Sequence, residues 1–205
     1  MFRRTLLSLA LAAAFTPGLA SAQSALATEG PWLIRLRATY MLNDNTNDPS
    51  LSLGQIEAKD RWIPEIDVSY FFTDNIAAEL VLTWPQKIDV SLNGTDIGSL
   101  KALPPTLLVQ YHFIPDGTIR PYIGAGINYT YFSSQSFSIN GVSTSNSSWG
   151  PALQAGVDFK IAPKWYINAD VKYVWMDTEV KLNGATLTTV DINPWLLSLG
   201  VGYRF

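Results

Sequence analysis

Charged side chains alternate with apolar ones in this sequence, and they carry most of its possible chemistry. Arg35, Arg37, Glu65 and Asp67 each have an apolar residue on either side. Five acids, five bases and the single histidine occupy these alternating positions. Opposite charges enclosed together are expected to form ion pairs rather than a reactive centre. The members of this charge cluster are Arg35, Arg37, Glu65, Asp67, Glu79, His112, Arg120, Asp158, Asp170, Lys172 and Arg204.

Catalytic chemistry has few candidates. The chain has no cysteine and one histidine, His112, which excludes thiolate nucleophiles, Cys/His zinc sites and two-histidine metal motifs. Ser69 is the nearest serine in the same phase, but no Gly-x-Ser-x-Gly segment exists, and Gly124-x-Gly126 lacks the third glycine of a dinucleotide motif. We therefore expect no enzyme activity, cofactor or metal, and the net charge of −3 does not favour nucleic-acid binding.

The N-terminus has the three parts of a secretory signal peptide. Arg3 and Arg4 provide a positive region, residues 6–15 are apolar, and the small residues 20–22 form a cleavage site. A membrane anchor helix is the alternative, but the apolar run is shorter than the roughly 20 residues that such a helix needs. We expect a signal peptide over residues 1–22 and a mature domain over residues 23–205.

The mature chain alternates with a period of two, which is the pattern of β-strands with one apolar face. Turn residues separate some of these strands closely, at 73–75, 115–117 and 162–164, whereas long polar segments lie near 43–60, 86–101, 133–148 and 177–193. The eight predicted strands span residues 32–42, 62–72, 76–84, 105–113, 121–131, 149–159, 165–175 and 195–205.

An even number of strands with alternating short turns and long loops is typical of a bacterial outer-membrane barrel. A soluble eight-stranded barrel or sandwich is the rival architecture. All seven tryptophans share the apolar phase and lie at strand ends, which favours the aromatic girdles of a membrane barrel over a packed soluble core. The predicted fold is an all-β, eight-stranded antiparallel transmembrane β-barrel with both termini in the periplasm.

Several short motifs together cover nearly all of the mature chain. They are Leu103-Pro104-Pro105-Thr106, residues 110–113 and 120–130, Ser148-Trp149-Gly150 and residues 202–205. Through these motifs the sequence resembles the OmpW family. The resemblance implies an outer-membrane barrel of Gram-negative bacteria with a narrow apolar channel, proposed to admit small hydrophobic molecules. It also implies an apolar constriction near the height of Lys172, where this chain has a charge.

The inward-facing phase changes character along the barrel axis. Towards the short turns it holds the charge cluster, which is expected to plug an interior that side chains just fill; a purely structural role for this network is the simpler interpretation. Towards the long loops it is apolar, which suits a small hydrophobic ligand. The predicted ligand-binding residues of this apolar lumen are Met41, Ile63, Val81, Leu108, Phe132, Val174, Met176 and Leu196.

Prolines provide a possible exit from a lumen that is closed below. Pro85 ends the third strand, and Pro104 and Pro105 begin the fourth, so both strands lose hydrogen-bond donors at one height. These three residues predict a lateral seam into the bilayer. Alternatively, they only end strands where loops begin.

Three classes of function remain open at this point. The first is an outer-membrane channel for passive uptake of small hydrophobic molecules, with lateral release into the bilayer. The second is a non-conducting structural, adhesive or receptor barrel that acts through its loops, and the third is a lumen enzyme. The expected partners are outer-membrane lipid, small hydrophobic solutes and the barrel-assembly machinery, which would recognise the C-terminal Phe205.

Overall fold

The computed structural model describes residues 29–43, 46–47, 56–58, 60–92, 95–137 and 142–205. The predicted signal peptide, residues 1–22, lies outside this range. Within the described ranges, no helix combines the length and the apolar character needed to cross a membrane.

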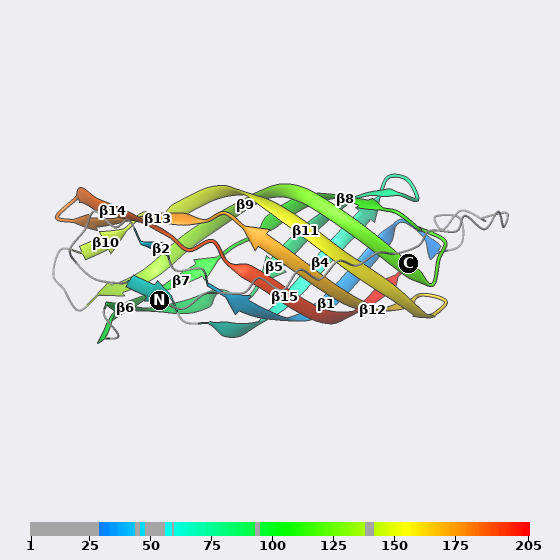
Figure 1. Ribbon diagram of the computed structural model, residues 1–205, viewed down its shortest axis with the longest axis horizontal. Coiled ribbons are helices and arrows are strands. Elements are labelled where there is room, and N and C mark those ends of the chain that lie inside the picture. Colours follow the sequence, from blue (N-terminus) through cyan, green and yellow to red (C-terminus); the bar gives the residue numbers. More distant parts are fainter. Residues whose placement is uncertain (1–28, 44–45, 48–55, 59, 93–94, 138–141) are drawn as a thin grey trace, which may run out of the picture.

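Eight antiparallel strands form the closed barrel that runs lengthwise in Figure 1. The first strand pairs with both the second and the last, which closes the sheet. Backbone hydrogen bonds of 3.1 and 2.9 Å between Trp32 and Phe205 fasten this closure. The predicted eight-stranded barrel is confirmed. Its strands are β1 (Trp32–Leu42), β4 (Arg61–Phe71), β5 (Ile76–Thr83), β8 (Thr106–His112), β9 (Ile119–Phe137), β11 (Ser147–Ala162), β12 (Trp165–Val174) and β15 (Trp195–Arg204).

Burial alternates along the strands, with polar side chains inside and apolar ones outside. In β8, Gln110 and His112 are buried, whereas Leu107 and Val109 are 50 % and 59 % exposed. A soluble barrel would have the opposite arrangement, because water would face the polar side of each strand. The exposed apolar surface is the lipid-facing surface of an outer-membrane barrel.

Aromatic rings gather at both ends of this apolar surface. All seven tryptophans are exposed. Trp32 packs on Tyr70 with ring centroids 4.8 Å apart, and at the other end of the same strands Tyr40 packs on Trp62 at 5.1 Å. The amphipathic rings therefore form the two girdles that the tryptophan positions predict.

The segments expected to be long loops contain further strands where the structure describes them. Two hairpins extend the wall at one end of the barrel, on the left in Figure 1, which we call the loop end; the opposite end, with the short turns and Phe205, is the turn end. The Asn183-Gly184 turn has φ values of 51° and 85°, as a two-residue hairpin requires. The additional strands are β2 (Thr46–Asn47), β3 (Ile56–Ala58), β6 (Gln86–Leu92), β7 (Thr95–Leu103), β10 (Val142–Thr144), β13 (Asp177–Leu182) and β14 (Ala185–Asp191).

Candidate functional site: a charged lumen beneath an apolar cavity

Arg35 lies at the centre of the charge cluster and links three strands across the lumen. Its guanidinium donates two hydrogen bonds to Asp158 on β11, at 3.1 and 2.7 Å. It also contacts Asp67 on β4 at 2.9 Å, and Ser69 at 3.0 Å. All four side chains are buried, so these charge-assisted bonds replace the water that the charges lose.

Arg37 and Lys172 form a second layer of ion pairs, closer to the loop end. Arg37 Nη1 donates to Glu65 at 3.0 Å and Nη2 to Glu79 at 2.7 Å. Lys172 Nζ donates to Glu65 at 2.9 Å and to Asp170 at 2.6 Å. Together with Arg35, these bases form ion pairs with all five acids of the charge cluster.

Glycines make room for the largest members of this network. A Cβ atom at position 156 would lie 2.4 Å from the ring of Tyr122. One at position 200 would lie 2.2 Å from the backbone oxygen of Leu36 and 2.7 Å from Cγ of Arg37. The Tyr122 hydroxyl uses the space to donate to Asp170 at 3.1 Å. The glycines on the inward face are therefore part of the packing of the plug.

Glu29 closes the turn end of the lumen, although the sequence pattern did not predict it as a lumen residue. It accepts hydrogen bonds from both Nη atoms of Arg120, at 2.8 and 3.1 Å, and from Lys160 and Tyr166; Arg204 Nη1 lies 3.6 Å away. Burial raises the pKa of Glu29, but the hydrogen bonds from Arg120, Lys160 and Tyr166 outweigh burial and lower it from 4.5 to about 2. No strand pattern indicates this residue, because Glu29 precedes the first strand.

His112 and Ser69 are not arranged as a base and a nucleophile. The His112 Nε2 atom lies 3.1 Å from Oε1 of Gln110, and the ring packs between Phe71 and Tyr122. Ser69 accepts its hydrogen bond from Arg35 instead. No cluster of acidic and histidine side chains in the described part of the chain could hold a metal ion.

Above the charges, the lumen is packed with apolar side chains. All eight predicted ligand-binding residues lie here: seven are buried, and Leu196 is partly buried. The loop-end segments add Leu100, Ala102 and Ile192 to these apolar side chains; the sequence pattern did not predict them, because it predicts loops there. The packing leaves a cavity of about 30 Å³, enough for about one water-sized molecule.

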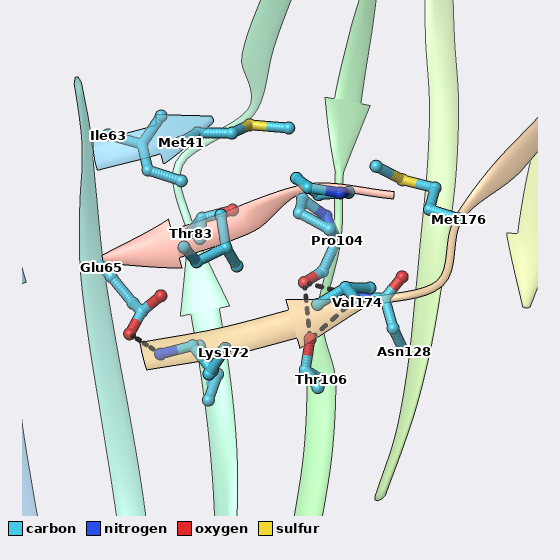
Figure 2. A pocket seen from close by; sticks show the side chains of 13 residues that line it. Met41, Ile63, Glu65, Thr83, Pro104, Thr106, Asn128, Lys172, Val174 and Met176 are labelled. Carbon is cyan, nitrogen blue, oxygen red and sulfur yellow. Dashed lines mark hydrogen bonds and ion pairs between the residues drawn. The ribbon is translucent and has the colours of Figure 1, made fainter. Parts of the chain in front are cut away.

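The floor of this cavity is polar (Figure 2). Lys172 and Glu65 form their ion pair there, and Asn128 donates a hydrogen bond of 2.8 Å to Thr106. Glu65 and Thr83 are directly opposite each other on β4 and β5. The floor is therefore where the charge cluster meets the apolar lumen, at the height expected for Lys172.

The ladder of the barrel wall is interrupted beside the cavity. Pairing between β5 and β8 ends at Val81 and Thr106, and it resumes between β6 and β7 at Gln86 and Ala102. No strand pairing joins residues 82–85 to residues 103–105 in the described ladder. The three prolines of the predicted seam, Pro85, Pro104 and Pro105, lie in this gap.

Among the described residues, a second interruption of the ladder lies on the other side of Pro85. Pairing between β4 and β5 ends at Glu65 and Thr83, and it resumes between β3 and β6 at Ala58 and Val90. An outward-facing groove of about 370 Å³ lies at this point, and Glu65 and Thr83 line both this groove and the lumen cavity. The other residues of the groove are Leu36, Pro64, Ile66, Leu82 and Trp84.

Comparison with known proteins places the whole barrel in one family. The family model described as the OmpW family matches residues 28–205. Outer membrane protein W of Vibrio cholerae is 33 % identical over 99 % of this chain and 100 % of its own length, and an uncharacterized outer-membrane protein of Sinorhizobium fredii, y4mB, is 40 % identical over 95 % and 93 %. The crystal structure of OprG from Pseudomonas aeruginosa superposes with a TM-score of 0.73 at 26 % identity, covering 85 % of this chain and 96 % of OprG. The chain therefore belongs to the OmpW family of outer-membrane β-barrels.

Proposed function

We propose that this protein is an outer-membrane channel for the passive uptake of small hydrophobic molecules. A solute enters the apolar lumen from the loop end, which faces the medium in barrels of this type, and leaves sideways into the bilayer. One observation carries the proposal: the apolar cavity lies above a lumen closed by ion pairs and beside an interrupted strand ladder.

The relative cost of the two exits favours the lateral one. Passage through the plug would separate buried ion pairs such as Arg35 with Asp158, and each broken pair costs about 3–5 kcal/mol. Passage through the wall at residues 82–85 and 103–105 breaks no ladder bond, and even one backbone hydrogen bond contributes only about 1 kcal/mol. A solute therefore meets the lower barrier beside Pro85.

The cavity must widen to hold a hydrocarbon, because its 30 Å³ accommodate only about one water. Met41 and Met176 line it. Their unbranched side chains adapt to different shapes at low cost. We infer that movement of these two side chains, together with the segment around Pro104, opens the cavity to a solute.

Uptake and conductance together test the transport proposal. Cells with the protein are expected to take up a panel of small apolar compounds faster than cells without it, while the purified barrel shows little ion conductance in planar bilayers. Equal uptake by both kinds of cell would contradict the channel. Appreciable conductance would contradict the plug.

Engineered disulfides test the lateral exit, since the chain has no native cysteine to interfere. A disulfide between positions 84 and 104 spans the gap, and its oxidised form is expected to slow uptake, with recovery on reduction. The matched control joins positions 80 and 107, which already pair in the β5–β8 ladder. Unchanged uptake with the oxidised 84–104 bridge would eliminate this seam.

A barrel that acts through its loops remains the alternative. The hairpins β6–β7 and β13–β14 favour it, because they give the loop end an ordered surface that a partner could bind. Removing the tip of one hairpin would then abolish binding to cells or surfaces while leaving uptake of apolar compounds unchanged. If the protein is a channel, changes at the cavity should instead reduce uptake of apolar compounds and leave binding to cells or surfaces unchanged.

We also propose that Phe205 is read by the barrel-assembly machinery. Its ring is 46 % exposed and stacks beside Tyr203 on the lipid face, while its backbone closes the barrel against Trp32. Phe205→Ala retains those backbone bonds, so it should lower the amount of assembled barrel in cells but not refolding of the purified chain. Phe113→Ala, an exposed ring away from the C-terminus, is the control.

A further inference from the structure

Two polar atoms at the cavity floor have no partner among the described residues. They are Oε2 of Glu65 and Oγ1 of Thr83, and both are buried. The two residues face each other as a directly opposed pair on β4 and β5, so their Cβ atoms lie about 5 Å apart. Both line the lumen cavity. One small polar group could therefore reach both atoms at once.

The charges around Glu65 determine which polar group fits. Its other oxygen, Oε1, already binds two cations, Arg37 at 3.0 Å and Lys172 at 2.9 Å. An ammonium group would lose its hydration shell in a cavity that holds about one water, and Glu65 already has two cations beside it. An anion would meet a carboxylate oxygen that can only accept a hydrogen bond. A neutral group that donates one hydrogen bond and accepts another satisfies both orphaned atoms.

We propose that the cavity selects slender neutral amphiphiles that carry a terminal hydroxyl group, in preference to hydrocarbons, amines and carboxylates. The ligand hydroxyl donates to Glu65 Oε2 and accepts from Thr83 Oγ1, and its alkyl chain extends towards Met41 and Met176. The narrow cavity favours an unbranched chain over a ring. This inference rests on the proposed function and names the class of solute that the channel takes.

The methionines provide a direct readout of occupancy. The chain has three, and two of them, Met41 and Met176, line the cavity. The full-length barrel, labelled with ¹³C in its methionine methyl groups and embedded in lipid nanodiscs, is titrated with 1-hexanol, heptane, hexylamine and hexanoate. We expect 1-hexanol and heptane to shift both methyl signals, and the two charged compounds to leave them unchanged.

Variants distinguish the hydroxyl contact from partition of the ligand into lipid, because the half-saturating concentration of each ligand is compared between variants and not with that of another ligand. Thr83→Val has the same shape and lies outside the ion pairs; it is expected to raise the half-saturating concentration of 1-hexanol about fivefold and to leave that of heptane unchanged. Glu65→Gln is expected to act in the same direction by about tenfold. Ile63→Val, an apolar change in the same cavity, is the control and should affect both ligands equally.

Each outcome has one meaning. If Thr83→Val changes neither ligand, a water molecule rather than the solute satisfies the two atoms, and the hydroxyl preference is wrong while the hydrophobic channel stands. The hydroxyl preference is also wrong, and the channel still stands, if hexylamine or hexanoate shifts the methyl signals to the same extent as 1-hexanol. If no compound shifts either methionine, the cavity is not a solute site, and the proposed function fails with this inference.

Discussion

Buried charge is tolerated at Arg35 because several acids surround it. Desolvating a guanidinium costs several kcal/mol, and only close, well-oriented partners offset that cost. Asp158 supplies two bonds from the opposite wall, and Asp67 supplies one from the neighbouring strand. The bridge across the lumen therefore depends on Asp158 more than on any other single acid.

Removing the charge of Asp158 should leave Arg35 with too few partners. Asp158→Asn is expected to lower the free energy of unfolding by about 3 kcal/mol, measured by urea titration of the refolded barrel in detergent. The matched control is Lys181→Met, which removes the exposed ion pair with Glu179 at 3.0 Å and should cost less than about 0.5 kcal/mol. Equal effects of the two changes would contradict a buried, interlocked plug.

Glu29 makes stability at the turn end depend on pH. Its folded pKa of about 2 lies below its ordinary 4.5, so its stabilising contribution is complete above pH 4.5 and is lost as the pH falls towards 2. Glu29→Gln should therefore destabilise the barrel at pH 7 by about 2 kcal/mol, less than full linkage predicts because Lys160, one of its partners, has a side chain that is 31 % exposed. In unfolding measurements the difference from the native chain should shrink only below pH 4.5; Glu179→Gln is the control.

At the scale of strands, simple alternation predicted most of the fold. The eight barrel strands were predicted within one or two residues, except that β9 runs six residues further into the loop end and β11 three residues further into the turn end. This succeeded because one face of every strand meets lipid and the other meets the lumen. The loop-end hairpins were missed since neither face meets lipid, although the Asn183-Gly184 pair was a signal for one of them.

The same reasoning explains what was found of the site. Alternation brought the charged and apolar lumen residues to the correct face, but it could not pair individual charges, because partners such as Arg35 and Asp158 lie on opposite walls. Glu29 was missed because it precedes the first strand and therefore belongs to no alternating pattern. Contacts across a barrel depend on curvature and side-chain length, which one-dimensional patterns do not contain.

Close backbone contact at Gly126 fixes how β8 meets β9. A Cβ atom there would lie 1.9 Å from the backbone oxygen of Leu107, so Gly126→Ala is expected to prevent closure of the barrel. Gly202 is the matched control, because the nearest atoms to a Cβ there belong to the flexible side chains of Arg35 and Leu33, at 3.2 Å, and the backbone oxygen of Ile34 is at an ordinary contact distance of 3.6 Å. Heat-dependent migration on gels, which separates folded from unfolded barrels, should show folded protein for Gly202→Ala and little or none for Gly126→Ala.

On the scale of the whole molecule, the charges of the lumen are sorted along its axis. The centre holds five acids with Arg35, Arg37 and Lys172, whereas the turn end holds Glu29 with three bases. The two regions have formal charges of −2 and +2. These opposite charges lie in different parts of the lumen, so the two regions attract each other over a longer distance than the ion pairs within each region. Glu29, which closes the turn end, precedes the first strand, and its partners lie on later strands. The plug is therefore complete only after the barrel has formed.

Orientation in the membrane is the property on which the uptake proposal depends, and it has a direct test. The aromatic girdles fix the height of the barrel in the bilayer, and the short turns leave little chain outside it on one side. Protease added to intact cells should therefore cut only near residues 43–60, 86–101, 133–148 and 177–193, and the Pro115-Asp116-Gly117 turn should become accessible only after the outer membrane is permeabilised. The fragments are identified by mass spectrometry, and a periplasmic protein that stays intact serves as the control for membrane integrity. Cleavage at 115–117 in intact cells would invert the barrel, so that the apolar cavity would open to the periplasm and uptake from outside would have to begin at the charged plug.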